Sequence, residues 1–233
     1  SSLPQQPVNL VNAALAQDRL SLVWDTPWLP IRESQHLQRY WQSDLAREAL
    51  FWHVQRVLSE KKTQGVQVGF DCRVLYQRAQ CAINIDADSG TLNNHLELIA
   101  KEMANVRDNG LSQQEFNALL AQKNTELNKL FATYARTDTD VLMSQRLRSQ
   151  QNSVVDIAPE QYQRLRQAFL SGLTIEMLNQ ELRQQLSQDV TMVLMQPPGE
   201  PEINAGLLQA NWQKIMQPVE AAPQAPATPA DPA

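Results

Sequence analysis

Residues 65–86 read GVQVGFDCRVLYQRAQCAINID, and apolar and polar side chains alternate along both halves of this stretch. Alternation with a period of two is typical of a half-buried β-strand. A turn at Tyr76-Gln77 would join the two halves into a hairpin and place Phe70 opposite Ile83. A slip of one residue would turn the apolar face of one strand over. The expected apolar faces are Val66, Val68, Phe70, Cys72 and Val74 on the first strand, and Ala79, Cys81, Ile83 and Ile85 on the second.

Helical patterns flank this hairpin on both sides. A long helix is expected from Ser34 to about Lys61, and its wide apolar face predicts that it is well buried. After the hairpin, Thr91 is a candidate cap for the helix LNNHLELIAKEMANVRDN, whose apolar residues form one stripe. The first helix buries Leu37, Trp41, Leu45, Ala49, Trp52 and Leu58 in this interpretation, and the second buries Leu92, Leu96, Ile99, Met103 and Val106.

The stretch DNGLSQQEF, residues 108–116, ends one helix and begins another. Asn109-Gly110 is a helix-ending pair, because Gly takes the left-handed conformation without strain. Ser112 and Glu115 have the spacing of a capping box, in which each side chain bonds the backbone N–H of the other residue. We therefore predict a sharp reversal between two helices here.

Strand patterns also occur toward both ends of the chain, before the long helix and after the last predicted helices. RLSLVWD (19–25) alternates like a half-buried strand, and VTMVLMQ (190–196) is a short apolar strand ended by two prolines. Helices are predicted between these strands, including one from TDTD (137–140) to about Ser149 and others after Pro159 and Thr174. A run of helices set between strands indicates an α+β domain, with a mostly antiparallel sheet and helices layered on one face.

The chain ends differ from this central domain in composition. Residues 1–7 resemble a linker, and the main domain is expected over 8–199. Residues 200–217 contain a possible short amphipathic helix with Leu208, Trp212 and Ile215, which either packs back onto the domain or binds a partner. The Pro/Ala-rich tail, 218–233, is predicted to be disordered because it has too little apolar surface to fold.

Composition argues against several classes of protein. The net charge of −5 and the pI near 5.3 argue against nucleic acid as a partner. No apolar run reaches the length of about 18–20 residues that a membrane span needs. Neither a nucleophile elbow nor a glycine-rich phosphate loop is present.

The residues that could carry metal or acid–base chemistry are scattered. His36, His53 and His95 are too far apart in sequence for a helical zinc motif, and HLQRY (36–40) lacks both the base and the second ligand of HxxEH. All three histidines are interpreted as helix-surface or packing residues. Glu97, Glu102 and Glu115 fit solvated helix faces and a cap. The residues alone therefore predict no catalytic residue and no metal site.

The collinear set of motifs resembles the peptidase M16 family, the group that includes insulinase, pitrilysin and the mitochondrial processing peptidase. NGLSQQEFNALLAQKNTEL (109–127) is similar to the family's helix start, and the preceding hairpin and helix and the following helices and strand are similar in order. The resemblance runs from about Val8 to Pro197. Three stretches most resemble periplasmic homologues of enteric bacteria: RLSLVWDTPWLPIRES, LAREALFWHVQ and FDCRVLYQRAQCAINI.

The resemblance implies the LuxS/MPP-like metallohydrolase fold and a defined place in a larger molecule. M16 proteins contain paired halves of similar fold, and the zinc-binding HxxEH motif, where present, belongs to the N-terminal half. This chain resembles the C-terminal half, so the implied role is a non-catalytic domain that supports peptide binding between two halves. The implied partners are the N-terminal half and a peptide, and the implied location is the periplasm. The alternative is a non-enzymatic scaffold or interaction domain from a degenerate member.

One departure from the family concerns the junction between the long helix and the hairpin. Active members usually carry an Arg and a nearby Tyr there, but this chain reads VLSEKKTQGVQVGF. Lys61 and Lys62 stand near the position of the Arg, and no Tyr follows. No catalytic residue is therefore transferred to this chain.

Two further expectations concern disulfide bonding and the partner half. In the hairpin register given above, Cys72 faces Cys81 as a non-hydrogen-bonded pair, close enough for a disulfide that an oxidising periplasm would permit. Two reduced, buried cysteines, or a register shifted by two residues, are the alternatives. If the chain is half of a clamshell, one of its faces should be unusually apolar and should contact the other half.

Overall fold

The computed structural model describes residues 6–27, 34–75, 78–134 and 157–218. Along the chain the elements are β1 (Val8–Val11), β2 (Asp18–Pro27), α1 (Ser34–Glu60), β3 (Val66–Leu75), β4 (Arg78–Ala87), α2 (Leu92–Asn109), α3 (Gln113–Tyr134), α5 (Pro159–Gly172), α6 (Ile175–Gln185), β5 (Thr191–Gln196) and α7 (Ala205–Met216). The helix predicted from residue 137 to 149 lies outside the described residues.

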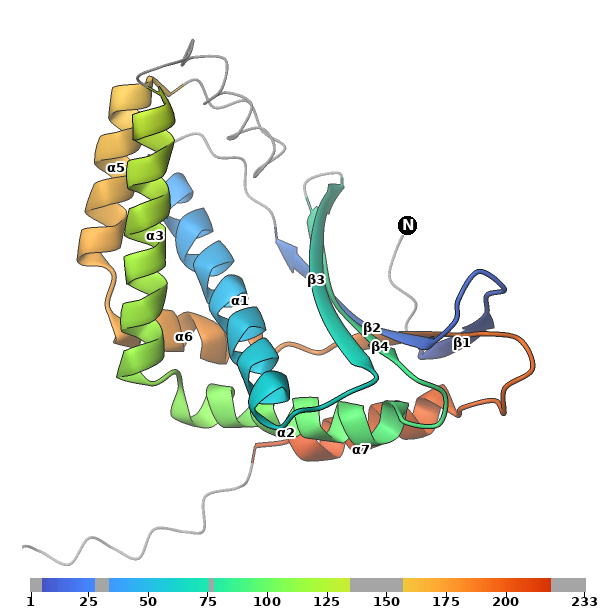
Figure 1. Ribbon diagram of the computed structural model, residues 1–233. Helices are drawn as coiled ribbons and strands as arrows, with labels where there is room; N and C mark the ends of the chain where they lie inside the picture. The colour runs from blue at the N-terminus through green and yellow to red at the C-terminus, as the bar shows by residue number, and fades with distance from the viewer. Residues whose placement is uncertain (1–5, 28–33, 76–77, 135–156, 219–233) are drawn as a thin grey trace, which may run out of the picture.

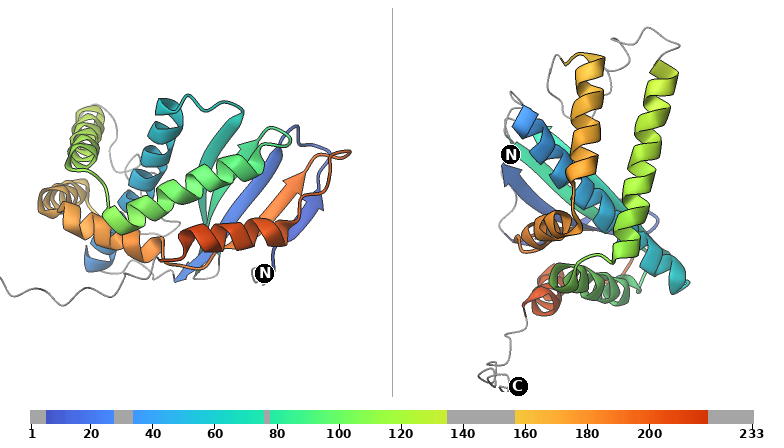
Figure 2. Two further views of the ribbon diagram at one scale, coloured as in Figure 1. Left: turned by 90° about the horizontal axis from the view of Figure 1, so that it is seen from below. Right: turned by 90° about the vertical axis from the view of Figure 1, so that its left-hand side faces the viewer.

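The strands form one sheet in the order β1-β5-β2-β4-β3. β1 pairs with β5 in parallel, and every other pairing is antiparallel. Helices α1, α2 and α7 lie on one side of this sheet, and α3 and α5 lie farther out, beyond α1 (Figures 1 and 2). The predicted α+β class and the one-sided helix layer are confirmed.

The hairpin has the predicted register. Phe70 pairs with Ile83, Val68 with Ile85, and Cys72 with Cys81. Burial follows the same alternation in β4, because Cys81, Ile83 and Ile85 are buried against the helices while the residues between them are partly exposed. The predicted turn residues, Tyr76-Gln77, lie outside the described residues.

The core lies between the sheet and α1, α2 and α7. The sheet contributes alternate residues, which is the pattern of an antiparallel sheet with one covered face. Side chains with less than 2 % exposure include Leu20, Leu22, Ile85, Met192 from the sheet and Leu37, Leu45, Leu96, Ile99 from the helices. The predicted helical stripe of α2 is buried throughout.

The sequence prediction wrongly assigned Trp52 of α1 to the buried face. Trp52 is 50 % exposed, and its neighbour His53 is buried with 6 % exposure. The buried stripe runs through Leu45, Ala49 and His53 at intervals of four residues, so Trp52 falls outside it. His53 can occupy the buried position because it forms hydrogen bonds there with Glu102 of α2 and Glu115 of α3.

The reversal between α2 and α3 forms as predicted. Gly110 has φ of +76°, and its N–H donates to the carbonyl of Val106 at 2.8 Å. Ser112 Oγ accepts from the N–H of Glu115, and Glu115 Oε1 accepts from the N–H of Ser112, both at 3.1 Å. Asn179 of α6 adds a contact that the sequence did not predict, since its Oδ1 accepts from the N–H of Leu111 at 2.9 Å.

Three features at the edges of the domain differ from or extend the sequence prediction. Strand β1 was not predicted. Thr91 precedes α2, but its hydroxyl donates to the carbonyl of Asp88 at 2.6 Å and does not cap the helix. Helix α7 packs onto the domain, where Leu208 and Trp212 are buried in the core.

Candidate functional site

The sheet has one face that no described helix covers (Figures 1 and 2). We call it the open face. Its residues alternate with the core residues along each strand, so they are fixed by the same register that builds the core. The open face includes Arg19, Ser21 and Val23 on β2, Ala82, Asn84 and Asp86 on β4, and Val193 and Met195 on β5.

The middle of the open face is polar, and its groups bond each other across strands. Arg19 lies directly opposite Asp86 and makes two contacts with it, Nε to Oδ1 at 2.7 Å and a second guanidinium nitrogen to Oδ2 at 3.2 Å. Ser21 lies opposite Asn84, and the Ser21 hydroxyl donates to Asn84 Oδ1 at 2.6 Å. These cross-strand pairs satisfy the polar groups within the sheet.

The β1/β5 side of the open face is apolar. Val8 pairs with Val193, and Leu10 pairs with Met195, so these four side chains share one face. Leu10 is 53 % exposed, and the other three are partly exposed. We call this group, Val8, Leu10, Val193 and Met195, the apolar strip. The apolar side chains of the open face thus cluster on this side, whereas polar pairs occupy its middle.

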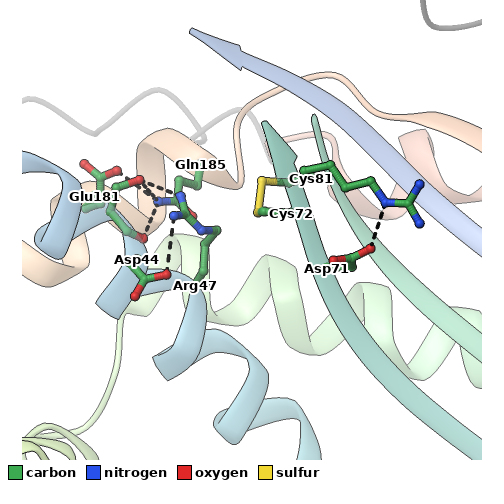
Figure 3. Close-up of a disulfide and its surroundings, with 9 residues drawn as sticks. Asp44, Arg47, Asp71, Cys72, Cys81, Glu181 and Gln185 are labelled. Carbon is green, nitrogen blue, oxygen red and sulfur yellow. Dashed lines mark hydrogen bonds and ion pairs between the residues drawn. A yellow bond between two sulfur atoms is a disulfide. The ribbon is translucent and has the colours of Figure 1, made fainter. Parts of the chain in front are cut away.

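The tip of the hairpin carries both cysteines of the chain. The structure joins Cys72 of β3 to Cys81 of β4, with an S–S distance of 2.07 Å and a Cα–Cα distance of 4.1 Å (Figure 3). Cys81 is buried, while Cys72 is exposed on the edge strand. The pair lies on the helix-covered side of the hairpin and therefore outside the open face.

A buried histidine connects three helices. His53 of α1 has Nε2 at 2.6 Å from Glu102 Oε1 of α2 and Nδ1 at 2.5 Å from Glu115 Oε2 of α3. Arg56 adds a positive charge 3.3 Å from Glu115 Oε2. We call these four residues the three-helix junction.

The three-helix junction corrects the interpretation of Glu102 and Glu115 as a solvated face and a simple cap. Burial tends to raise the pKa of Glu115, but hydrogen bonds from His53 and Ser112 outweigh it, so this pKa lies below its ordinary value. Both ring nitrogens of His53 are occupied by carboxylates, so the ring is arranged for a structural role. No sequence motif could have revealed this contact, because the partners lie 49 and 62 residues away.

A second buried carboxyl group lies at the start of β2. Asp18 has no exposed surface, and Gln196 Nε2 donates to its Oδ1 at 3.3 Å. Burial and a hydrogen bond with the Glu200 carboxyl raise the pKa of Asp18 to about 6. Gln196 also accepts from Asn9 at 2.8 Å and from the N–H of Ile203 at 2.9 Å, so this network joins β1, β2 and β5 to the segment before α7.

The remaining sequence candidates are dispersed. His36 lies in the first turn of α1, and His95 lies on α2. Lys61 and Lys62 are exposed in the turn after α1. Within the described ranges, no group of three or more His, Cys, Asp or Glu side chains is placed to hold a metal ion. No described helix has the length and apolar character needed to cross a membrane.

Comparisons with known proteins identify the family. A family model described as the peptidase M16 inactive domain matches residues 2–123. Protein YhjJ of Escherichia coli (strain K12) is 63 % identical over 222 residues, which cover 95 % of this chain and 45 % of that protein. Protein YhjJ of Salmonella typhimurium is 62 % identical over the same length. The chain therefore spans about half the length of the curated relatives it matches.

Solved structures agree with this assignment. A structure described as a predicted insulinase family protease from Yersinia pestis has 64 % identity and a TM-score of 0.84, covering 92 % of this chain and 47 % of that chain. The first half of the periplasmic protease PqqL from Escherichia coli has a TM-score of 0.74 at 13 % identity, covering 93 % and 48 %. The second likeness shows the fold alone. The chain belongs to the peptidase M16 family and is similar to the inactive domain of that family, as its motifs predicted.

Proposed function

We propose that this chain is the non-catalytic C-terminal half of a two-half M16 protein and that it supports peptide binding between the halves. The open face would turn toward the N-terminal half, and an extended peptide would lie between the two sheets. Residues 1–7 would link the halves. The chain covers 45 % of the length of its curated relatives, which leaves room in them for a second domain of similar size.

The apolar strip is the observation that carries this proposal. It spans β1 and β5 on a sheet face that lacks a helix layer among the described elements, and its Leu10 side chain, on the edge strand, is 53 % exposed. Contiguous exposed apolar side chains rimmed by polar ones mark interaction surfaces. The polar pairs Arg19–Asp86 and Ser21–Asn84 lie beside the strip, where they could contact a peptide backbone.

Zinc, if the whole protein binds it, would belong to the N-terminal half. Among the described residues no cluster of His, Cys, Asp or Glu is placed for zinc, and the ring nitrogens of His53 are already bonded to Glu102 and Glu115. We also propose a periplasmic location, as in the resemblance to periplasmic homologues. Such a compartment would keep Cys72 and Cys81 oxidised.

Peptide binding can be measured by fluorescence anisotropy with a labelled, unstructured peptide about 20 residues long. The two-half protein should bind it, and each half alone should bind weakly. Ser21→Arg should weaken binding, because a large side chain would project from the middle of the open face. Glu176→Arg, on α6 and away from the sheet, is the matched control.

Two results would contradict this proposal. One is equal peptide binding by Ser21→Arg and the unmodified protein, which would place the peptide elsewhere. The other is no binding by the two-half protein, which would favour the alternative of a scaffold domain without a peptide ligand.

A further inference from the structure

A cavity of about 600 Å³ lies on the helix-covered side of the sheet. Its walls come from the sheet, from α1, α2 and α7, and from the segment 185–190 before β5. This volume lies within the range of small-molecule binding sites. Because it is on the opposite side of the sheet from the open face, it is separate from the proposed peptide site.

Much of the cavity wall is apolar. Its apolar side chains come from β2, β4, α1, α2 and α7, and they include Leu22, Trp24, Leu50, Ile83, Met103 and Trp212. Three cationic side chains, Arg47, Arg107 and Lys214, also line the cavity, against one anionic side chain, Asp189. An apolar cavity with an excess of positive charge is complementary to an anionic, largely apolar ligand.

The two arginines in the wall differ in how well the protein supplies hydrogen-bond acceptors for their guanidinium groups. Arg107 has Nε at 3.0 Å from Asp108 Oδ1 and also donates to the carbonyl of Met216. Such contacts leave Arg107 well paired within the protein.

Arg47 is less well paired. One of its terminal nitrogens donates to Ser43 Oγ at 2.7 Å, and the other lies 3.6 Å from Asp44 Oδ1. The Nε of Arg47 is buried and has no hydrogen-bond partner. Figure 3 shows Arg47 between Asp44 and Gln185, on the side of α1 toward the hairpin. The terminal nitrogens of Arg47 are therefore the part of this side chain that a ligand in the cavity would meet, and the one near Asp44 is only loosely paired.

We propose that this cavity binds a linear amphiphile with a carboxylate head, the chemical class of a long-chain fatty acid. The carboxylate would accept from the terminal guanidinium N–H groups of Arg47, and Lys214 would add to the positive charge of the wall. The hydrocarbon chain would then lie along Leu50, Met103 and the sheet residues of the cavity floor. This inference goes beyond the proposed function and does not depend on it.

The affinity should depend on chain length in a defined way. Each buried methylene contributes about 0.8 kcal/mol, which corresponds to an increase in affinity of about fourfold. Affinity should therefore rise from octanoate to decanoate to dodecanoate, and it should stop rising when the chain fills the cavity.

Calorimetric titration of dodecanoate into the 233-residue chain, below the micelle concentration, tests this proposal. We expect one site per chain. Arg47→Gln should weaken dodecanoate binding about tenfold or more, the range expected for a charged hydrogen bond. Arg39→Gln, which changes an exposed arginine on the same helix, should leave the affinity unchanged. Dodecanol, which lacks the charge, should bind both variants alike.

Three results would overturn the proposal: no saturable binding of dodecanoate, equal dodecanoate affinity in Arg47→Gln, or equally tight binding of dodecyltrimethylammonium. Quenching of tryptophan fluorescence by a brominated dodecanoate gives a second measurement, which needs no variant. Trp24 and Trp212 line the cavity, so the ligand should quench them in the unmodified chain. Absence of quenching at saturating ligand would also contradict the proposal.

Discussion

Asp18 shows how one buried carboxyl group sets a pH response. In the unfolded chain its pKa is near the ordinary value of 3.8, and in the folded chain it is about 6. The folded state therefore binds an additional proton between these two values. The stability contributed by this group is fully present below about pH 4 and is lost as the pH rises through about 6. At neutral pH the buried carboxylate destabilises the fold.

Asp18→Asn should therefore stabilise the protein at pH 7.5, by about 1–2 kcal/mol. The amide imitates the protonated carboxyl group, since its oxygen accepts from Gln196 and its NH₂ can donate to Glu200. At pH 4 the variant and the parent should be equally stable. Urea unfolding at the two pH values measures both differences, and a gain that is the same at both would contradict this account of Asp18.

The two cysteines carry a second prediction at this scale. We expect the protein isolated from an oxidising compartment to contain no free thiols, because Cys72 and Cys81 are directly opposite in the hairpin. Mass spectrometry after alkylation without reduction should show no added groups. Two alkylated thiols would mean that the pair is reduced.

The bond also closes a short loop, since the cysteines are nine residues apart. The double substitution Cys72→Ser and Cys81→Ala should lower the free energy of unfolding by about 2–3 kcal/mol, the cost expected from the loop entropy of the unfolded chain. Treatment of the parent with a reductant should give a similar loss, whereas the variant should not respond to reductant.

At the scale of elements, the three-helix junction holds α1, α2 and α3 together. His53 lies between Glu102 and Glu115, and Glu115 also caps α3 through Ser112. One carboxyl group therefore fixes both the start of α3 and its position against α1. The backbone reversal at Gly110 also fixes how α3 is placed relative to α2. A Cβ added at Gly110 would lie 2.4 Å from the Asn179 side chain.

His53→Leu should destabilise the protein by about 2–3 kcal/mol at pH 7, because it leaves two partly buried carboxylates without their shared hydrogen-bond partner. The lowered pKa of Glu115 means that its contribution is present above the ordinary carboxyl pKa and is lost as the pH falls through the folded value. The difference between variant and parent should therefore shrink in acid.

The matched control for this substitution is His95→Leu, which changes a half-buried histidine of α2 outside the junction. Chemical denaturation of both variants at pH 7 and pH 4 compares them. A loss in His53→Leu that equals the loss in His95→Leu would mean that the carboxylate contacts contribute nothing to stability.

Local patterns allowed some elements to be predicted and not others. The hairpin register follows from a period of two that fixes which side chains share a face. The capping box follows from four neighbouring residues. Strand β1 has only four residues, VNLV, and its partner β5 lies 185 residues later, so nothing local identifies it. The three-helix junction and the cavity likewise depend on contacts between distant elements.

At the scale of the whole molecule, the sheet separates two surfaces. The covered side contains the core and the cavity beside Arg47, and the open face contains the apolar strip and the polar pairs. The curated relatives are about twice as long as this chain, and under the proposed function the rest of such a protein would cover the open face. The strip is then the surface that the rest of the protein would cover.

Association with the N-terminal half tests the central claim most directly. The two halves, supplied as separate polypeptides at concentrations on the order of 10 μM, should elute as one complex in size-exclusion chromatography. Leu10→Lys should weaken the complex, because it replaces the most exposed side chain of the apolar strip with a charge. Leu207→Lys is the control, since Leu207 is 63 % exposed on α7, a helix on the covered side of the sheet (Figure 2). A single complex that only Leu10→Lys disrupts is the predicted result. Two separate peaks for the unmodified halves, or a complex that Leu10→Lys leaves intact, would contradict the account.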